Sequence, residues 1–287
     1  MENTQHVLLA VLAHPDDESF GMGGTLALYA QRGIQVHLIC ATRGEAGDMD
    51  ADCLEGFDSI AERRVSELRC AAAILGLTGV YFLDYRDSGM PGSADNGNPD
   101  ALMRAPLAEV SGKIAHYIRK LHPQVIITFD PIGGYKHPDH IAVHQATVQA
   151  FNLAADASFL DEDLLLPWQG QKLYYHVFPK GALHLAAWVM PILGRDPRHF
   201  GRNGDIDLVE LVNSGNFPAH ATIDYRIVDE KREAAAACHA SQLGGGPPDR
   251  GILSWLWRRT AGKDHFMRAY PPFKGKLKET DLFEGIQ

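Results

Sequence analysis

An almost unbroken apolar run near the N-terminus, residues 6–13, leads directly into the polar sequence His14-Pro15-Asp16-Asp17-Glu18. A run of this length is typical of a strand that is covered on both faces, as strands of parallel sheets are. Residues 21–30 predict a glycine-rich turn that enters a helix, and Gly33 predicts the end of that helix. The polar cluster therefore follows the carboxyl end of a first strand, where open α/β sheets bind their ligands.

Strand-like and helix-like segments alternate along the rest of the chain. The expected strands are 36–41, 80–83, 125–130, 172–178 and 219–224, and the expected helices are 59–76, 102–121, 137–155 and 228–241. This alternation predicts an α/β fold: a Rossmann-like parallel sheet with helices on both faces and right-handed crossovers. We expect one domain over residues 1–287, with the Rossmann-like core at about 5–180 and a smaller C-terminal lobe at about 181–287, which Trp255 and Trp257 help to pack.

The first polar cluster carries side chains of the kind that ligate metal ions. His14 and Asp17 lie three residues apart on one tight loop that Pro15 stiffens, so both side chains can reach one cation. Asp16 lies between these two presumed ligands. Its carboxylate should therefore point away from theirs and remain free to act on a metal-bound water. The alternative interpretation is that the cluster only caps the following helix.

A second cluster, His137-Pro138-Asp139-His140, also follows an apolar run and opens a helix, and His144 lies one turn further on. Pro138 fits the first helical position, which puts His140 and His144 on one helical face. Two strand-to-helix junctions that both carry ligand-type side chains favour a single shared metal site. Spacing alone does not choose between His140 and His144.

Other polar segments give weaker indications. Arg43 follows the second expected strand and is a candidate to hold a substrate hydroxyl or carboxylate, although an ordinary salt bridge to Glu45 or Asp48 explains it equally well. Asp87 and Ser88 follow the third strand and are candidates to line the opening of the same site. However, residues that only form a turn would give the same sequence pattern. The helix at 59–76, which a capping box predicts, is expected to be scaffold.

Composition excludes several classes of partner. The formal net charge is -9 and no run of Lys or Arg resembles a phosphate-binding patch, so nucleic acid is not an expected partner. The four cysteines, at positions 40, 53, 70 and 238, show no C-x-x-C spacing, and we expect them to be reduced. No apolar run approaches membrane-spanning length and the first residues do not resemble a signal peptide, so we expect a cytoplasmic protein that does not bind membranes.

The two clusters together, A-H-P-D-D-E and H-P-D-H, closely resemble the LmbE/PIG-L family of zinc-dependent N-deacetylases, which act on N-acetylglucosamine-type groups. The resemblance extends to residues 41–45, to Arg64 and Glu67, to residues 85–90, to Gly133-Gly134-Tyr135 and to residues 239–242. The wording Y-R-D-S-G-M and G-G-Y-x-H-P-D-H is most similar to the deacetylase and amidase branch of low-molecular-weight thiol metabolism, including the mycothiol-pathway deacetylase. Residues 181–218 match nothing in the family and are expected to shape the aglycone pocket.

The resemblance implies roles for individual residues. It makes His14, Asp17 and His140 the zinc ligands and Asp16 the general base. It makes His137 a transition-state stabiliser or acid that Asp139 orients. It also suggests that Tyr135 donates to the oxyanion or leaving group and that Arg43 contacts the sugar.

Three protein ligands with an open fourth position are the catalytic form of a zinc site. Together with this, the resemblance implies hydrolysis of an amide to acetate and a free amino sugar. Imidazole and carboxylate ligands also accept Fe(II), Co(II) or Mn(II). An amidase of thiol-sugar conjugates and a non-catalytic metal- or sugar-binding module are the alternatives. A dinucleotide-binding oxidoreductase is disfavoured, because residues 21–24 do not form G-x-G-x-x-G. The aglycone and the oligomeric state, homo-oligomers included, are left open.

Overall fold

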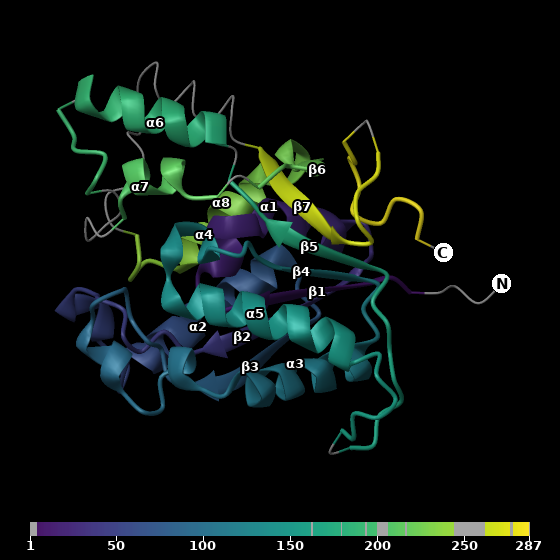
Figure 1. Ribbon diagram of the computed structural model, residues 1–287. Coiled ribbons are helices and arrows are strands. Elements are labelled where there is room, and N and C mark those ends of the chain that lie inside the picture. Colours follow the sequence, from purple (N-terminus) through teal and green to yellow (C-terminus); the bar gives the residue numbers. More distant parts are fainter. Residues whose placement is uncertain are drawn as a thin grey trace.

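The computed structural model describes residues 5–161, 163–178, 180–192, 194–199, 206–215, 217–243, 262–275 and 278–286. Within these ranges one sheet of seven strands runs through the molecule in the order β3-β2-β1-β4-β5-β7-β6 (Figure 1). The strands are β1 (Val7–Leu12), β2 (Gln35–Thr42), β3 (Gly79–Tyr85), β4 (Val125–Phe129), β5 (Lys172–His176), β6 (Ala221–Asp224) and β7 (Lys263–Tyr270).

The sheet is parallel over its first five strands and antiparallel at one edge. Strands β3, β2, β1, β4 and β5 pair in parallel, whereas β7 pairs antiparallel with both β5 and β6. The sequence predicted the α/β fold correctly but missed β7 and its antiparallel pairing. Strands β6 and β7 both follow residue 180 and extend the same sheet as the core strands. The division into a core and a C-terminal lobe stays a prediction.

Helices cover both faces of the sheet, as the alternation predicts. Right-handed crossovers put the helices that connect β1, β2 and β3 on one face and those that connect β3, β4 and β5 on the other. Accordingly α1 and α2 contact each other and α8, while α3 packs against α5. The helices are α1 (Asp17–Gln31), α2 (Ile60–Leu75), α3 (Leu107–Leu121), α4 (Gly133–Lys136), α5 (Pro138–Leu153), α6 (Lys180–Ile192), α7 (Leu208–Asn213) and α8 (Asp229–Cys238).

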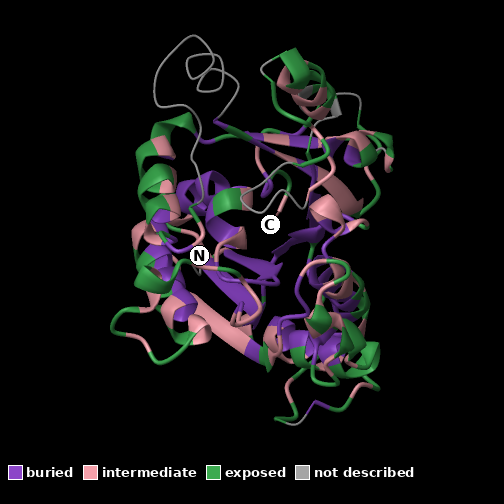
Figure 2. Cartoon of the chain, turned by 90° about the vertical axis from the view of Figure 1, so that its left-hand side faces the viewer, coloured by how far each residue is buried: buried purple, intermediate pink, exposed green. Residues whose placement is uncertain are grey.

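The core is centred on β1, because this strand lies between β2 and β4 and is covered on both faces. All six of its residues are buried, and Figure 2 shows the buried strands at the centre of the molecule with exposed residues on the outer helices. The apolar run near the N-terminus is therefore an interior strand of the sheet, and the polar residues that follow it leave the core at the carboxyl end of this strand.

Helix α1 begins earlier than expected. The sequence predicted a glycine-rich turn at residues 21–24, but α1 begins at Asp17 and continues through these glycines with a kink at Met22. A Cβ atom at Gly24 would lie 2.1 Å from the ring of Tyr225, so the absence of a side chain there permits close packing rather than a turn. The start of the helix consequently coincides with the polar cluster itself.

The expectation of four reduced cysteines is wrong for two of them. Cys70 in α2 and Cys238 at the end of α8 form a disulfide across 168 residues of sequence, while Cys40 and Cys53 are free. Sequence spacing could not reveal this bond, because α2 and α8 become neighbours only when the chain folds. No helix among the described residues is long and apolar enough to cross a membrane. Trp255, Trp257 and the predicted chain break at residues 244–248 lie outside the described residues.

Candidate metal centre

The two polar clusters meet at the point where the strand order of the sheet reverses. Strands β1 and β4 are neighbours although two strands separate them in sequence, and a crevice forms beyond their carboxyl ends. The loop after β1 supplies His14 and Asp16, and α1 begins with Asp17. The segment after β4 supplies His137, and the first turn of α5 supplies the residues that follow it.

Three ligand-type side chains converge there. Nε2 of His140 lies 3.2 Å from Oδ1 of Asp17 and 3.3 Å from Nδ1 of His14, and this Nδ1 lies 3.6 Å from Oδ2 of Asp17. A tetrahedral ion with bonds of about 2.1 Å holds its ligand atoms about 3.4 Å apart. Ligand atoms of the three side chains therefore lie at about the mutual spacing that a divalent metal ion requires.

The other nitrogen of the His14 ring is held by carboxylates. Nε2 lies 3.2 Å from Oδ2 of Asp139 and 3.4 Å from Oδ1 of Asp87. Asp139 is itself fixed by Ser88, which donates its backbone N–H over 2.8 Å and its hydroxyl to the same carboxylate. A proton on Nε2 that points at these acids leaves Nδ1 with its lone pair toward the ligand cluster. This arrangement of carboxylate, histidine and metal position is the usual one in metal sites.

The geometry refines the role expected of Asp139 and corrects the one expected of Ser88. The Asp139 carboxylate contacts His14 and Ser88, whereas the backbone N–H of Asp139 donates to Nδ1 of the His137 ring over 3.2 Å. Ser88 is fully buried behind Asp139 and does not line the mouth of the site. His144, which the spacing left as an alternative ligand, has Nδ1 bonded to the carbonyl oxygen of Phe129 at 2.8 Å.

The electrostatic balance of the cluster suits a cation. Three carboxylates, of Asp17, Asp87 and Asp139, contact the His14 ring, and the guanidinium of Arg64 lies near those of Asp16 and Asp87. Although burial lowers the pKa of His14, Asp87, Asp139 and Asp17 raise it well above its ordinary value. The His14, His137 and His140 group and the His14, Asp87 and Asp139 group are both compact enough to hold a metal ion. A divalent ion would offset the excess negative charge that the free site carries.

Asp16 is held beside the ligand cluster by Arg64 and has an unusual backbone conformation. Its Oδ2 accepts a hydrogen bond from Nη2 of Arg64 at 2.9 Å, and the backbone at Asp16 has a positive φ of 124°. A non-glycine residue with positive φ is strained, and such residues cluster at functional sites. Burial raises the pKa of Asp16 to about 6, against the opposing effect of Arg64. A carboxylate with its pKa near neutrality is matched to proton transfer at physiological pH.

Arg64 contacts the presumed base, although its helix had been expected to be scaffold. Its guanidinium donates to the carbonyl oxygens of Gly44 and Pro15 and to the Asp16 carboxylate, so it ties two strand-exit loops together. It lies on the apolar face of α2, beside Val65 and one turn before Leu68, and all three are buried. The sequence already showed a charged residue on the apolar face of this helix. Such an arginine predicts a buried ion pair, because buried arginines are rare unless they are paired.

A second buried network supports Asp16 from behind. Glu18 is fully buried and accepts hydrogen bonds from the backbone N–H of Asp16 at 3.0 Å and from Nε2 of His239 at 2.7 Å. His239 follows α8 and belongs to the sequence His239-Ala240-Ser241-Gln242, which the family resemblance had marked without assigning a role. The C-terminal part of the chain thus fixes the loop that carries the presumed base.

A polar cleft opens over the ligand cluster. It has a volume of about 490 Å³, and His14, Asp16, Tyr135 and His137 line its inner end. Polar side chains of other loops line the rest: Asp48, Arg64, Asp87, Ser93, Asp95 and Gln242. Ile206 also lines the cleft, which brings one residue of the unmatched segment 181–218 to the site. Volumes of 300–1,000 Å³ are typical of sites for small molecules.

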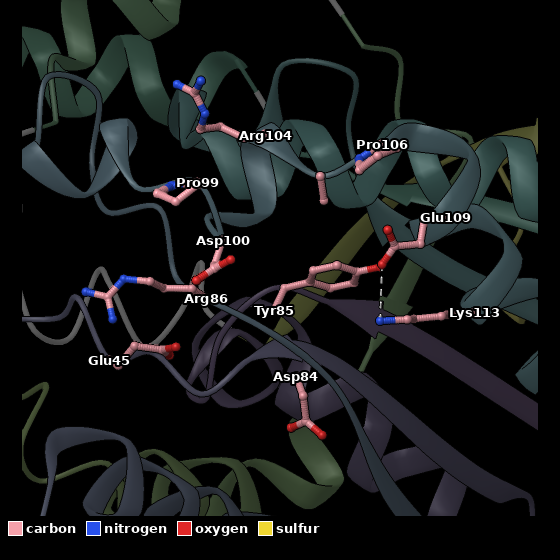
Figure 3. Close-up of a pocket in the computed structure, with 11 residues that line it drawn as sticks. Glu45, Asp84, Tyr85, Arg86, Pro99, Asp100, Arg104, Pro106, Glu109 and Lys113 are labelled. Carbon is pink, nitrogen blue, oxygen red and sulfur yellow. Dashed lines mark hydrogen bonds and ion pairs between the residues drawn. The ribbon is translucent and has the colours of Figure 1, made fainter.

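Arg43 does not reach this cleft. Its guanidinium donates to Oδ1 of Asp84 over 2.6 Å and stacks on the ring of Phe82, so the geometry does not support the expected contact with a sugar. A separate hollow of about 490 Å³ lies beyond β3, where Tyr85 reaches toward Glu109 (Figure 3). Its lining includes neither the presumed ligands nor Asp16.

Comparison with known proteins agrees with this geometry. The family described as PIG-L, GlcNAc-PI de-N-acetylase, matches residues 9–151, which include both polar clusters. A 1D-myo-inositol 2-acetamido-2-deoxy-alpha-D-glucopyranoside deacetylase of Streptomyces scabiei is 33% identical over 299 residues, covering 98% of this chain and 90% of the relative. The match therefore extends over nearly the whole of both chains, and it includes the C-terminal part that contributes His239.

Solved structures share the fold at lower identity. The N,N'-diacetylchitobiose deacetylase of Pyrococcus horikoshii has a TM-score of 0.61 and 21% identity, covering 92% of this chain and 84% of that one. A 4-carboxy-2-hydroxymuconate hydratase of Pseudomonas putida KT2440 has a TM-score of 0.60 and 19% identity, covering 95% and 100%. The fold alone thus carries more than one activity. The near full-length sequence match and the family match show that this chain is a member of the PIG-L/LmbE family of de-N-acetylases, which are amide hydrolases.

Proposed function

We propose that this protein is a metal-dependent N-deacetylase that removes the acetyl group from an N-acetylglucosaminyl conjugate, with an inositol-linked sugar of the kind named for its relatives as the first substrate to test. One observation carries the proposal. Nitrogen and oxygen atoms of His14, Asp17 and His140 converge at 3.2–3.6 Å next to Asp16, whose backbone has a positive φ, and His14 and Asp16 line a polar cleft.

The metal is proposed to be Zn(II), held by Nδ1 of His14, the carboxylate of Asp17 and Nε2 of His140. Two imidazoles and one carboxylate are a common ligand set of catalytic zinc. Fe(II), Co(II) and Mn(II) also suit these ligands. When bound, the ion would act as a Lewis acid and bring the pKa of a water molecule to about 7.

The residues of this chain would then carry the proton transfers. Asp16 would take a proton from the attacking water and, once protonated, could return that proton to the leaving amine. Tyr135 and His137 line the cleft beside Asp16 and are placed to stabilise the oxyanion of the tetrahedral intermediate. Burial lowers the pKa of His137 to about 2, so its ring is neutral in the free site and can act as a hydrogen-bond donor.

The polar lining of the cleft supports a sugar as the substrate. Carboxylates of Asp48, Asp87 and Asp95 face this space together with Gln242. Sugar hydroxyls are hydrogen-bond donors, and carboxylate oxygens accept such bonds with about twice the strength of neutral acceptors. A non-catalytic binding module is disfavoured, because binding alone does not require a strained acid held by Arg64 next to the metal position.

The test is a panel of N-acetylglucosamine conjugates incubated with protein that has been reconstituted with one metal at a time. Release of a primary amine and of acetate in equal amounts from the inositol conjugate is the expected result. The same panel should contain the corresponding N-acetylcysteinyl conjugate, whose cleavage in preference would favour the amidase alternative. Binding of the sugars without release of amine from any of them would contradict the proposal.

A further inference from the structure

A second, mainly apolar cavity adjoins the polar cleft. It has a volume of about 170 Å³, and its apolar lining comes from Phe20, Met22, Phe129 and Phe178. Burial lowers the pKa of His176, which also lines it, to about 4, so this ring is neutral at pH 7. Phe129 stacks on the His140 ring with 3.9 Å between the ring centroids. The cavity is therefore a hydrocarbon-like space that reaches the presumed metal ligands.

The polar cleft and the apolar cavity have some lining residues in common, and each has others of its own. Asp16, Tyr135 and Phe20 line both of them, whereas His14 and His137 line only the polar cleft and Asp17 and His140 line only the apolar cavity. An amide that reacts beside Asp16 carries one substituent on nitrogen and another on its carbonyl carbon. The sugar on nitrogen has hydroxyl groups that require the polar cleft. The acyl substituent on the other side of the amide would therefore extend into the apolar cavity.

We propose, on the basis of the proposed N-deacylase function, that this cavity binds the acyl group of the substrate and that it accepts straight acyl chains of up to about six carbons. The argument is one of volume. An apolar cavity of about 150 Å³ is large enough to hold benzene, which has six carbons, whereas a methyl group needs little more space than a water molecule. The ion at Asp17 and His140 would occupy the inner end of this space, and the methyl group of an acetyl substrate would fill only part of the remainder of the 170 Å³, so six carbons is the upper bound.

Chain length should therefore increase binding. Each methylene that moves from water into an apolar site contributes about a fourfold gain in affinity. We expect the KM of the butanoyl amide of the same sugar to be lower than that of the acetyl amide, with kcat/KM at least equal. Hydrolysis of either amide consumes one water and gives one carboxylic acid and one free amine.

Gly21 offers a way to fill the cavity without touching the reacting residues. It lines the cavity, and a Cβ atom there would meet only Nδ1 of His176 among the described residues, at 4.0 Å. Gly21→Leu adds four carbons at that position. Gly112→Leu is the matched control, since Gly112 is also a helical glycine with open space, its nearest neighbour being Phe159 at 3.9 Å, and it does not line either space.

The experiment measures kcat/KM for the acetyl, butanoyl and hexanoyl amides of one glucosaminyl conjugate, and the calorimetric Kd of acetate, butanoate and hexanoate with the zinc-reconstituted protein. The expected results are a butanoyl amide hydrolysed at least as efficiently as the acetyl amide and a hexanoate Kd at least tenfold below that of acetate. Gly21→Leu should remove both preferences for longer chains, and Gly112→Leu should retain them.

The outcomes separate this inference from the proposed function. If the acetyl amide is hydrolysed and the butanoyl amide is more than tenfold poorer, the acyl assignment is wrong while the deacetylase function stands. If no amide is hydrolysed, the proposed function fails. The Kd values of acetate, butanoate and hexanoate then test by themselves whether the cavity binds acyl chains. An affinity that rises with chain length and is lost in Gly21→Leu supports an acyl-binding cavity, and an affinity independent of chain length overturns it.

Discussion

Replacing Asp16 by Asn should lower activity and raise the stability of the metal-free protein at the same time. Asn keeps the shape of the side chain, and its carbonyl oxygen can accept the hydrogen bond that Nη2 of Arg64 now donates over 2.9 Å. Asn also tolerates positive φ at least as well as Asp does, so the backbone at φ 124° adds no strain in the variant. The substitution therefore removes mainly the ability to carry charge and a proton.

The two effects can be estimated separately. Loss of a general base lowers kcat by roughly 10²–10⁴-fold, which is about 3–5 kcal/mol of activation free energy. Burial raises the pKa of Asp16 from its usual value near 4 to about 6, so the folded state binds more protons than the unfolded state between these pH values. The free energy of unfolding therefore falls as pH rises through that window, by about 3 kcal/mol in total. A neutral Asn avoids this loss and should stabilise the metal-free protein at pH 8 by up to that amount.

The assay compares wild type, Asp16→Asn and Asp16→Ala in three measurements: metal content, kcat for amine release, and denaturant unfolding of the metal-free protein at pH 5 and pH 8. Asp16→Ala serves as the control that also loses the bond to Arg64. Metal lost together with activity in Asp16→Asn would show that Asp16 is a ligand or supports one. Full activity would show that the base lies elsewhere. Asp139 would then be the next candidate, because Glu18 is fully buried and already paired with His239.

Three further predictions concern the metal, the fold and pH. Single substitutions His14→Ala and His140→Ala should each abolish stoichiometric metal binding measured by elemental analysis, and undiminished metal in either would contradict the ligand assignment. Gly24→Ala should lower the free energy of unfolding by about 1–3 kcal/mol in denaturant titrations, since its Cβ would lie 2.1 Å from the Tyr225 ring. Helix propensity alone predicts a more stable variant, and that result would show that the ring moves freely. Burial raises the pKa of Asp264 to about 7, so the wild type should lose about 4 kcal/mol of unfolding free energy between pH 4 and pH 7, and Asp264→Asn should lack this component; identical pH profiles for the two proteins would refute it.

The sequence by itself determined the features that depend on neighbours along the chain. The apolar run before His14 predicted the first strand, because a run of this length is typical of a strand buried on both faces. The alternation of strands and helices then fixed which loops leave the same edge of the sheet, and so brought the clusters around His14 and His140 together. The sequence motifs of these two clusters were enough to indicate the family.

Tertiary structure decided everything that depends on contacts between distant segments. It joined Cys70 to Cys238, put the Asp139 carboxylate against His14, and paired Arg64 with Asp16. Neither the apolar cavity nor the antiparallel strand β7 could be predicted from periodicity. Periodicity and spacing report which face of an element is buried, but they carry no information about which other element covers that face, because that choice follows from how the whole chain packs.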